Sequence, residues 1–248
     1  MLVRLIAVAI APFIGSFLGV LALRLPEGRP IGWSRSACEH CGHVLAASDL
    51  VPIASFVALR GRCRYCRAGI GGFVLVIELA ALAVAVWAGL ETSGWILAVT
   101  CAFGWTLLLL AAIDWRVQLL PDVITLPLLA AGLSAAYFFA RESWLDHLIG
   151  AASGFIALAL VALVYRYLRG REGLGLGDAK LLAALGAWVA WGGIPTVLLW
   201  GSLLGLLFAL GRAVAGGSLR LSDRLPFGVF LASGGWLVWL YGPLLLTL

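Results

Sequence analysis

Two aspartates lie at the ends of apolar runs in this chain, where a charge is costly. Asp114 ends the run before WRVQLLPD, and Asp178 follows the glycine-rich segment GLGLG. Only 12% of the residues are charged. A carboxylate at membrane depth costs roughly 2.5–3.5 kcal/mol on insertion scales, so each acid in such a place is a candidate functional group. The two aspartates together predict acid–base chemistry at a membrane face.

The chemistry expected of such a pair follows from their mutual repulsion. Two carboxylates that meet at a partly dry site do not both ionise easily, so they share a proton. One then activates a water as a base while the other polarises a carbonyl as an acid. This is the logic of aspartic proteolysis, and it requires neither a nucleophilic serine nor a catalytic metal.

Three acidic residues have other possible roles, which either compete with this hypothesis or extend it. Asp178 has the structural alternative of capping the helix that follows it. Asp122 comes directly after Pro121 and is predicted to be the N-cap of the next helix. Glu78, inside an apolar run, either lines a polar site or reaches the membrane interface.

Four cysteines form a second constellation with a different chemistry. They occur as two C-x-x-C pairs separated by 21 residues: Cys38, Cys41, Cys63 and Cys66. This spacing is typical of four thiolates around a tetrahedral zinc ion, and four thiolates leave no open position, so the zinc is predicted to be structural. Gly42 and Gly61 suit the tight turns beside the pairs. Redox dithiols and free thiols are the alternatives, and His40 is a competing ligand.

The elements that must position these residues are membrane helices. The hydrophobic fraction is 63% and the mean hydropathy is +1.07, well above the roughly 45–50% apolar usage of soluble domains. Runs of about 18–21 apolar residues each suffice to cross a bilayer as a helix. We predict an all-α polytopic membrane protein with about eight transmembrane helices, or seven because the sixth is short. The expected spans are 5–23, 73–90, 95–113, 123–140, 147–165, 181–191, 194–214 and 227–247.

The distribution of basic residues predicts the orientation. With the N-terminus outside, 15 of the 17 lysines and arginines fall in cytoplasmic segments, and only Arg4 and Arg141 do not. This is the bias that the positive-inside rule describes. The net charge of +5 therefore reflects the orientation of the chain in the membrane, and no nucleic-acid-binding surface is expected. Both aspartates are predicted to face the cytoplasm.

The polar segment between the first two spans gives the expected domain organisation. We predict a first transmembrane helix at 1–24, a cytoplasmic four-cysteine loop at 25–72 and a transmembrane aspartic protease core at 73–248. Within the spans, three Gly-x-x-x-Gly pairs are candidates for close helix packing: Gly15/Gly19, Gly150/Gly154 and Gly201/Gly205.

At these residues the chain closely resembles the type IV prepilin peptidases, membrane aspartic proteases of the Gly-x-Gly-Asp class. The likeness covers nearly the whole chain and is carried by five ordered motifs: GSFLGVLALRLP at 15–26, the cysteine pairs with DLVPIASFVALRGRCRYC ending at 66, D-x6-PD-x2-TLPL at 114–128, GLGLGDAKLL at 173–182 and LPFGVFLASG at 225–234. The chain departs from the family pattern at Gly19, at 72–74 and at Val229, the last being a position where many members have proline. None of these departures changes either aspartate.

The resemblance implies that Asp114 and Asp178 are the catalytic pair. It implies cleavage of the short basic leader of type IV prepilins and type II secretion pseudopilins, at the cytoplasmic face of the bacterial inner membrane and just before the substrate's hydrophobic helix. It also implies methylation of the new N-terminus with S-adenosylmethionine, associated with the cysteine loop. The alternatives are a peptidase without methyltransferase activity, a proton-coupled transporter that uses the acids as relays, and a zinc-stabilised membrane scaffold.

Overall fold

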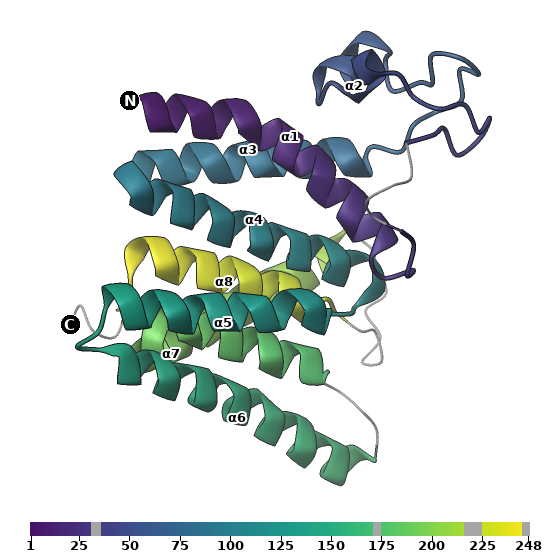
Figure 1. Cartoon of the computed structure of the whole chain (residues 1–248). Helices are drawn as coiled ribbons and strands as arrows, with labels where there is room; N and C mark the ends of the chain where they lie inside the picture. The colour runs from purple at the N-terminus through teal and green to yellow at the C-terminus, as the bar shows by residue number, and fades with distance from the viewer. Residues whose placement is uncertain (31–35, 171–174, 216–224, 245–248) are drawn as a thin grey trace. The chain divides into compact units, whose positions relative to one another are not determined.

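The computed structural model describes residues 1–30, 36–170, 175–215 and 225–244, and these residues are almost entirely helical (Figure 1). Within them, extended pairing is limited to two isolated β-bridges, so the prediction of an all-α fold is confirmed. The helices, in chain order, are α1 (Leu2–Arg24), the 3-10 helix η1 (Ala47–Leu50), α2 (Ala54–Ala58), α3 (Phe73–Glu91), α4 (Gly94–Val117), α5 (Asp122–Phe139), α6 (Trp144–Arg169), α7 (Leu176–Val214) and α8 (Phe227–Tyr241).

Six of the described helices are long and apolar enough to cross a membrane: α1, α3, α4, α5, α6 and α7. A polytopic membrane protein is thus confirmed, whereas the predicted number of eight spans is not. Helix α8 has 15 residues and a length of about 22 Å, which is shorter than the roughly 30 Å hydrocarbon layer. The end of the predicted eighth span, 245–247, lies outside the described residues.

Helix α7 explains why the number of spans is hard to predict. Its 39 residues would extend about 58 Å if straight, roughly twice the hydrocarbon thickness. The helix is interrupted at Ala190, whose backbone has φ 58° and ψ 177°. Pro195 follows and lacks the N–H that a helix needs at that position. The chain reverses at this break, because Leu185 before it and Val197 after it both lie against the same part of α8, at Gly235 and Gly234. The boundary predicted between spans 181–191 and 194–214 therefore coincides with the turn between two antiparallel helical segments of α7.

The chain separates into two compact units, Met1–Ala112 and Ile113–Leu248. In the first unit, α1 and α3 lie side by side (Figure 1). A Cβ atom added at Gly15 would lie 2.6 Å from the Cα of Glu78, and one at Gly19 would lie 3.2 Å from Val74. This glycine pair therefore permits the close helix packing that its spacing predicted. The indole N–H of Trp105 in α4 donates to the carbonyl of Ala81 in α3 at 3.0 Å.

The segment between α1 and α3 contains η1, α2 and the four cysteines, and much of it is exposed. Two polar contacts hold it in place. The Arg64 guanidinium donates to Asp49 at 2.6 Å, and this hydrogen bond lowers the pKa of Asp49. The buried carboxylate of Glu78 in α3 accepts a hydrogen bond from the backbone N–H of Ile53 at 2.7 Å. Glu78 therefore anchors the loop to a helix.

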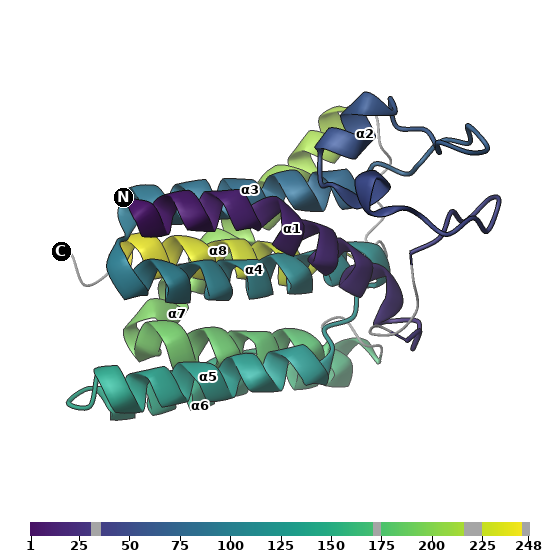
Figure 2. The same cartoon turned by 45° about the horizontal axis from the view of Figure 1, so that its top comes forward.

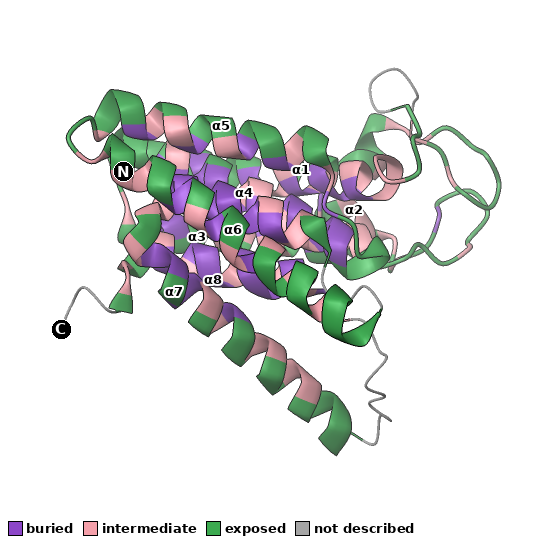
Figure 3. Cartoon of the chain, turned by 90° about the horizontal axis from the view of Figure 1, so that it is seen from below, coloured by how far each residue is buried: buried purple, intermediate pink, exposed green. Residues whose placement is uncertain are grey.

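In the second unit, α7 is the central element: α5, α6 and α8 all pack against it (Figures 1 and 2). The two remaining glycine pairs permit these contacts. Gly150 and Gly154 in α6 lie against backbone atoms of α7, and Gly201 and Gly205 in α7 lie against Phe230 and its neighbour in α8. All three predicted pairs thus lie at close helix contacts. The first half of α7 is buried, whereas its second half becomes exposed toward Val214 (Figure 3).

Candidate active site and candidate metal centre

Asp114 lies three residues before the end of α4, and only 4% of its surface is exposed. The chain leaves the helix at Gln118, which has a left-handed backbone with φ 52°. The N–H of Gln118 donates to the carbonyl of Asp114 at 2.9 Å, so the last helical turn is closed around the aspartate. A short connection through Leu120 and Pro121 then leads into α5. The acid is therefore fixed at the junction of two helices.

Asp178 is the third residue of α7 and is half-buried. The N-cap of this helix is Gly175, whose backbone also hydrogen-bonds to the carboxylate of Asp178. The preceding Gly177 lies against the α4–α5 connection, because a Cβ added there would be 3.1 Å from the Cβ of Leu120. Gly173 and Leu174 of the same motif lie outside the described residues. The absence of a side chain at Gly177 lets the start of α7 approach the segment that follows Asp114.

The structure brings Asp114 and Asp178 together from positions 64 residues apart in the chain. The starts of α7 and α8 both lie against the segment that carries Asp114, through Gly177 beside Leu120 and Gly228 beside Asp114, and the two acids are near enough to interact electrostatically. Both belong to the second compact unit. Such an arrangement allows two acids to share one proton, which is the requirement for paired acid–base chemistry.

The N-terminal turn of α8 also reaches this site, and the sequence did not indicate it. The N–H of Val229 donates to Oδ2 of Asp114 at 3.1 Å, and that of Gly228 faces the same carboxylate. The signal available in the sequence was the motif LPFGVF at 225–230, to which no role was assigned. The site therefore has contributions from α4, α7 and α8.

Asp122 has a different role from the one predicted. The N-cap of α5 is Pro121, not Asp122, and no side chain caps this helix end, so the N-cap prediction is wrong. The carboxylate of Asp122 instead forms an ion pair with Lys180, whose Nζ lies 2.7 Å from both carboxylate oxygens. The pairing with a cation in α7 outweighs the weaker bonds available within its own helix turn.

The four predicted cysteine ligands form one cluster in the first unit. The Sγ atoms of Cys38, Cys41, Cys63 and Cys66 all lie within 4.8 Å of one another. The distance between Sγ of Cys38 and Sγ of Cys66 is 3.8 Å. Tetrahedral zinc with Zn–S bonds of about 2.3 Å places its sulfur atoms about 3.8 Å apart. The cluster therefore fits a metal ion of this size and ligand preference.

The two cysteine pairs have matching backbone turns. The N–H of Cys38 donates to the carbonyl of His43 at 2.9 Å, and the N–H of Cys63 donates to that of Ala68 at 2.8 Å. Each turn requires a left-handed residue after its second cysteine. Gly42 fills this position with φ 68°, and Arg67 fills the equivalent one with φ 62°. The glycine was recognisable in the sequence, whereas the arginine was not.

The thiols of the cluster differ in acidity. Hydrogen bonds from the backbone of Cys41 and His40 lower the pKa of Cys38 to about 6. At Cys66 a backbone hydrogen bond from Ala68 acts in the same direction, but burial and hydrogen bonds with the neighbouring thiols raise the pKa to about 11. Cys101 lies apart, buried in α4, as expected of a packing residue.

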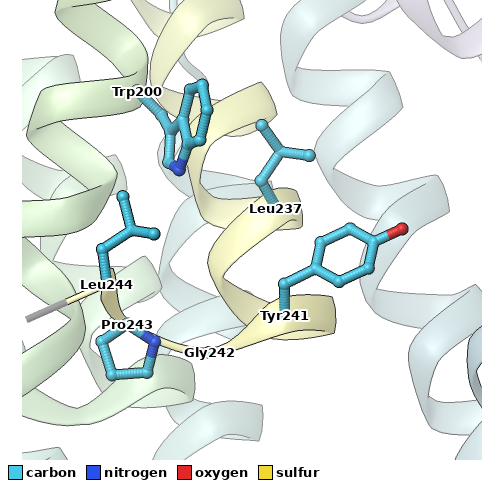
Figure 4. A pocket seen from close by; sticks show the side chains of 6 residues that line it. All are labelled: Trp200, Leu237, Tyr241, Gly242, Pro243 and Leu244. Carbon is cyan, nitrogen blue, oxygen red and sulfur yellow. The ribbon is translucent and has the colours of Figure 1, made fainter. Parts of the chain in front are cut away.

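A separate pocket lies at the opposite end of α8 from Gly228 (Figure 4). Its lining is mainly apolar: Trp200, Leu237, Tyr241, Gly242, Pro243 and Leu244. The hydroxyl of Tyr241 and the indole of Trp200 are its polar side-chain groups, and the pocket lining contains no carboxylate, histidine or cysteine. The paired carboxylates are therefore the better candidate for an active site.

The fold and these two constellations define an all-helical membrane protein with a pair of acids in its helical core and a four-thiol cluster in a loop. Comparison with known families gives the finer assignment. Residues 101–210 match the type IV leader peptidase family, and residues 9–92 match the bacterial Peptidase A24 N-terminal domain. These ranges contain Asp114, Asp178 and all four clustered cysteines.

Curated relatives agree over most of the chain. A prepilin leader peptidase/N-methyltransferase of Burkholderia pseudomallei (strain K96243) is 40% identical over 92% of this chain and 82% of its own length. Proteins with the same name from Aeromonas hydrophila and Pseudomonas aeruginosa are 38% and 33% identical, each over 92% of this chain and 87% of their own length. No solved structure matches. The chain belongs to the type IV leader peptidase family, as the resemblance of its motifs implied.

Proposed function

We propose that this protein removes the leader peptide from type IV prepilins and type II secretion pseudopilins and then methylates the new N-terminus. The observation that carries the proposal is the approach of Asp114 and Asp178 from distant helices. Membership of the family and the names of its relatives support both activities. A proton-coupled transporter and a peptidase without methyltransferase activity are not favoured by these names.

We infer that Asp114 and Asp178 are the catalytic residues. One carboxylate, unprotonated, takes a proton from a water as that water attacks the carbonyl carbon of the scissile bond. The other carboxyl group, protonated, donates a hydrogen bond to the carbonyl oxygen and stabilises the negative charge that develops there. Collapse of the tetrahedral intermediate breaks the C–N bond, and the departing amine takes up a proton from the pair.

The proposed location is the bacterial inner membrane, with the N-terminus outside and the active site facing the cytoplasm. The support is the concentration of basic residues in one set of loops. Among these residues, Arg35, Arg171, Arg220 and Arg224 lie outside the described part of the chain. A substrate held in the lipid bilayer by its own hydrophobic helix would present its basic leader at this face. We also retain the division into helix 1–24, loop 25–72 and core 73–248 as a proposal.

We further propose that the four-cysteine cluster holds a structural zinc ion. With four thiolate ligands the ion has no open coordination position, so it would order the loop and would not activate water. The methyl donor proposed for the second reaction is S-adenosylmethionine, as the N-methyltransferase name of the relatives suggests. The methyl group would pass to the free amine that leader removal exposes.

The test is leader removal from a pilin precursor in membranes that contain the wild-type protein, D114N or D178N. Both variants should insert normally and lose cleavage, because asparagine keeps the shape and removes the titratable group. D146N is the matched control, since Asp146 accepts from the indole of Trp191 and lies at the start of α6. Retained cleavage in D114N or D178N would reject the pair. Methyl incorporation, measured separately on a precleaved pilin, tests the second activity.

A further inference from the structure

The beginning of α8 lies directly against the Asp114 carboxylate. The N–H of Val229 is shared between Oδ2 of Asp114, at 3.1 Å, and the carbonyl of Pro226, at 3.3 Å. The first N–H groups of a helix have no partners within it and carry the positive end of the helix dipole. In α8 these groups are directed at the aspartate, so the helix start fixes the position of one of its oxygens.

Gly228 makes this approach possible. A Cβ added there would lie 2.9 Å from Oδ2 and 3.0 Å from Cγ of Asp114, and 3.1 Å from Cδ1 of Leu120. These distances are shorter than ordinary carbon contacts of about 3.5–4.0 Å. All three neighbours are side-chain atoms. A methyl group at this position would therefore displace the carboxylate by several tenths of an ångström and leave the helix backbone where it is.

We propose that Gly228 is a positioning residue for Asp114: the absence of a side chain at this position lets the carboxylate lie toward Asp178. The inference rests on the proposed function, in which these two acids perform the reaction. Catalytic groups must be held within about 0.5 Å of their productive geometry, and a displacement of about 1 Å costs roughly 100-fold in rate. A side chain at position 228 is therefore expected to impair the chemistry and not the binding of the precursor.

Gly228→Ala tests the inference. Its kcat for leader removal should fall roughly tenfold, since the displacement is smaller than 1 Å, while KM and the thermal unfolding midpoint stay near those of the wild type. Gly211→Ala is the matched control, because a Cβ at Gly211 in α7 meets nothing within 4 Å. A destabilised fold would lower the unfolding midpoint, which separates it from misplaced chemistry.

The failure of this inference differs from the failure of the proposed function. If the wild type cleaves the precursor and D114N does not, but Gly228→Ala retains the full kcat, Gly228 has no positioning role and only this inference is overturned. If Gly228→Ala raises KM and leaves kcat unchanged, the residue belongs to substrate binding and the inference is again wrong. Absence of cleavage by the wild type overturns the proposed function, and the inference with it.

Discussion

The ammonium group of Lys180 lies 2.7 Å from each carboxylate oxygen of Asp122, and this ion pair joins the N-terminal part of α7 to the first residue of α5. Asp178 is two residues before Lys180. Asp114 lies one short connection before α5. The ion pair therefore ties together the two segments that carry the proposed catalytic acids. Both partners are partly exposed, with 34% of the Lys180 side chain and 53% of the Asp122 side chain accessible, so the stabilisation is modest.

Removal of either partner of this ion pair is expected to cost stability and activity together. D122N and K180M should each lower the free energy of unfolding by about 0.2–1 kcal/mol, the range for solvent-screened surface pairs. The reversed pair D122K/K180D should recover part of that loss, since the attraction is restored with the charges exchanged. A double-mutant cycle with thermal unfolding and the rate of leader removal measures the coupling. Strictly additive effects would show that the pair contributes nothing.

The cysteine cluster predicts a defined metal content. Purified protein should contain about one equivalent of zinc per chain, and C38S or C63S should release it. Cys101→Ala is the control, because this buried cysteine lies outside the cluster and its loss should leave the zinc content unchanged. Metal analysis of protein prepared without chelators measures the result. Wild-type protein without metal would contradict the assignment.

Glu78 is expected to control the order of the loop between α1 and α3. In E78A the N–H of Ile53 loses its acceptor, which costs about 1 kcal/mol, the low end of the range for buried donors, because Ile53 is only partly buried. E78Q keeps an acceptor oxygen. The strained backbone of Ile53, with φ 62°, gives the loop a further reason to detach. Trypsin should therefore cut after the exposed Arg60 and Arg62 about tenfold faster in E78A than in the wild type.

The matched control for this experiment is E39Q, which alters an exposed glutamate in the same loop. Its cleavage by trypsin should proceed at the wild-type rate, and that of E78Q should be intermediate. If E78A and the wild type are cut equally fast, the contact between Glu78 and Ile53 does not hold the loop.

The contact between α6 and α7 predicts a strong effect of a single methyl group. A Cβ at Gly186 would overlap the carbonyl oxygen of Gly150, and both are backbone positions in packed helices. Gly186→Ala should therefore lower the free energy of unfolding by roughly 1–3 kcal/mol, the usual cost of overpacking. Gly211→Ala, a helical glycine with open space around it, should be neutral or slightly stabilising. Thermal unfolding in detergent compares the two, and an unchanged midpoint in Gly186→Ala would argue against this close approach.

The sequence by itself determined the features that depend on local chemistry. Apolar runs of bilayer length are helical in lipid, because every backbone group must be satisfied within the segment. Two C-x-x-C pairs indicated the thiol cluster, and the positions of Asp114 and Asp178 in apolar surroundings made them candidates. The three Gly-x-x-x-Gly pairs also indicated helix contacts, since only small side chains permit such a close approach.

Only the tertiary structure decided which residues these features meet. Asp122 pairs with Lys180, 58 positions away, and Glu78 holds Ile53, 25 positions away. The Asp114 carboxylate accepts a hydrogen bond from the N–H of Val229, which is 115 positions away in the chain. Helical periodicity defines the face on which a side chain lies but not the neighbouring helix that covers it. The partners are set by how whole helices pack, and that depends on shape complementarity summed over many residues at once.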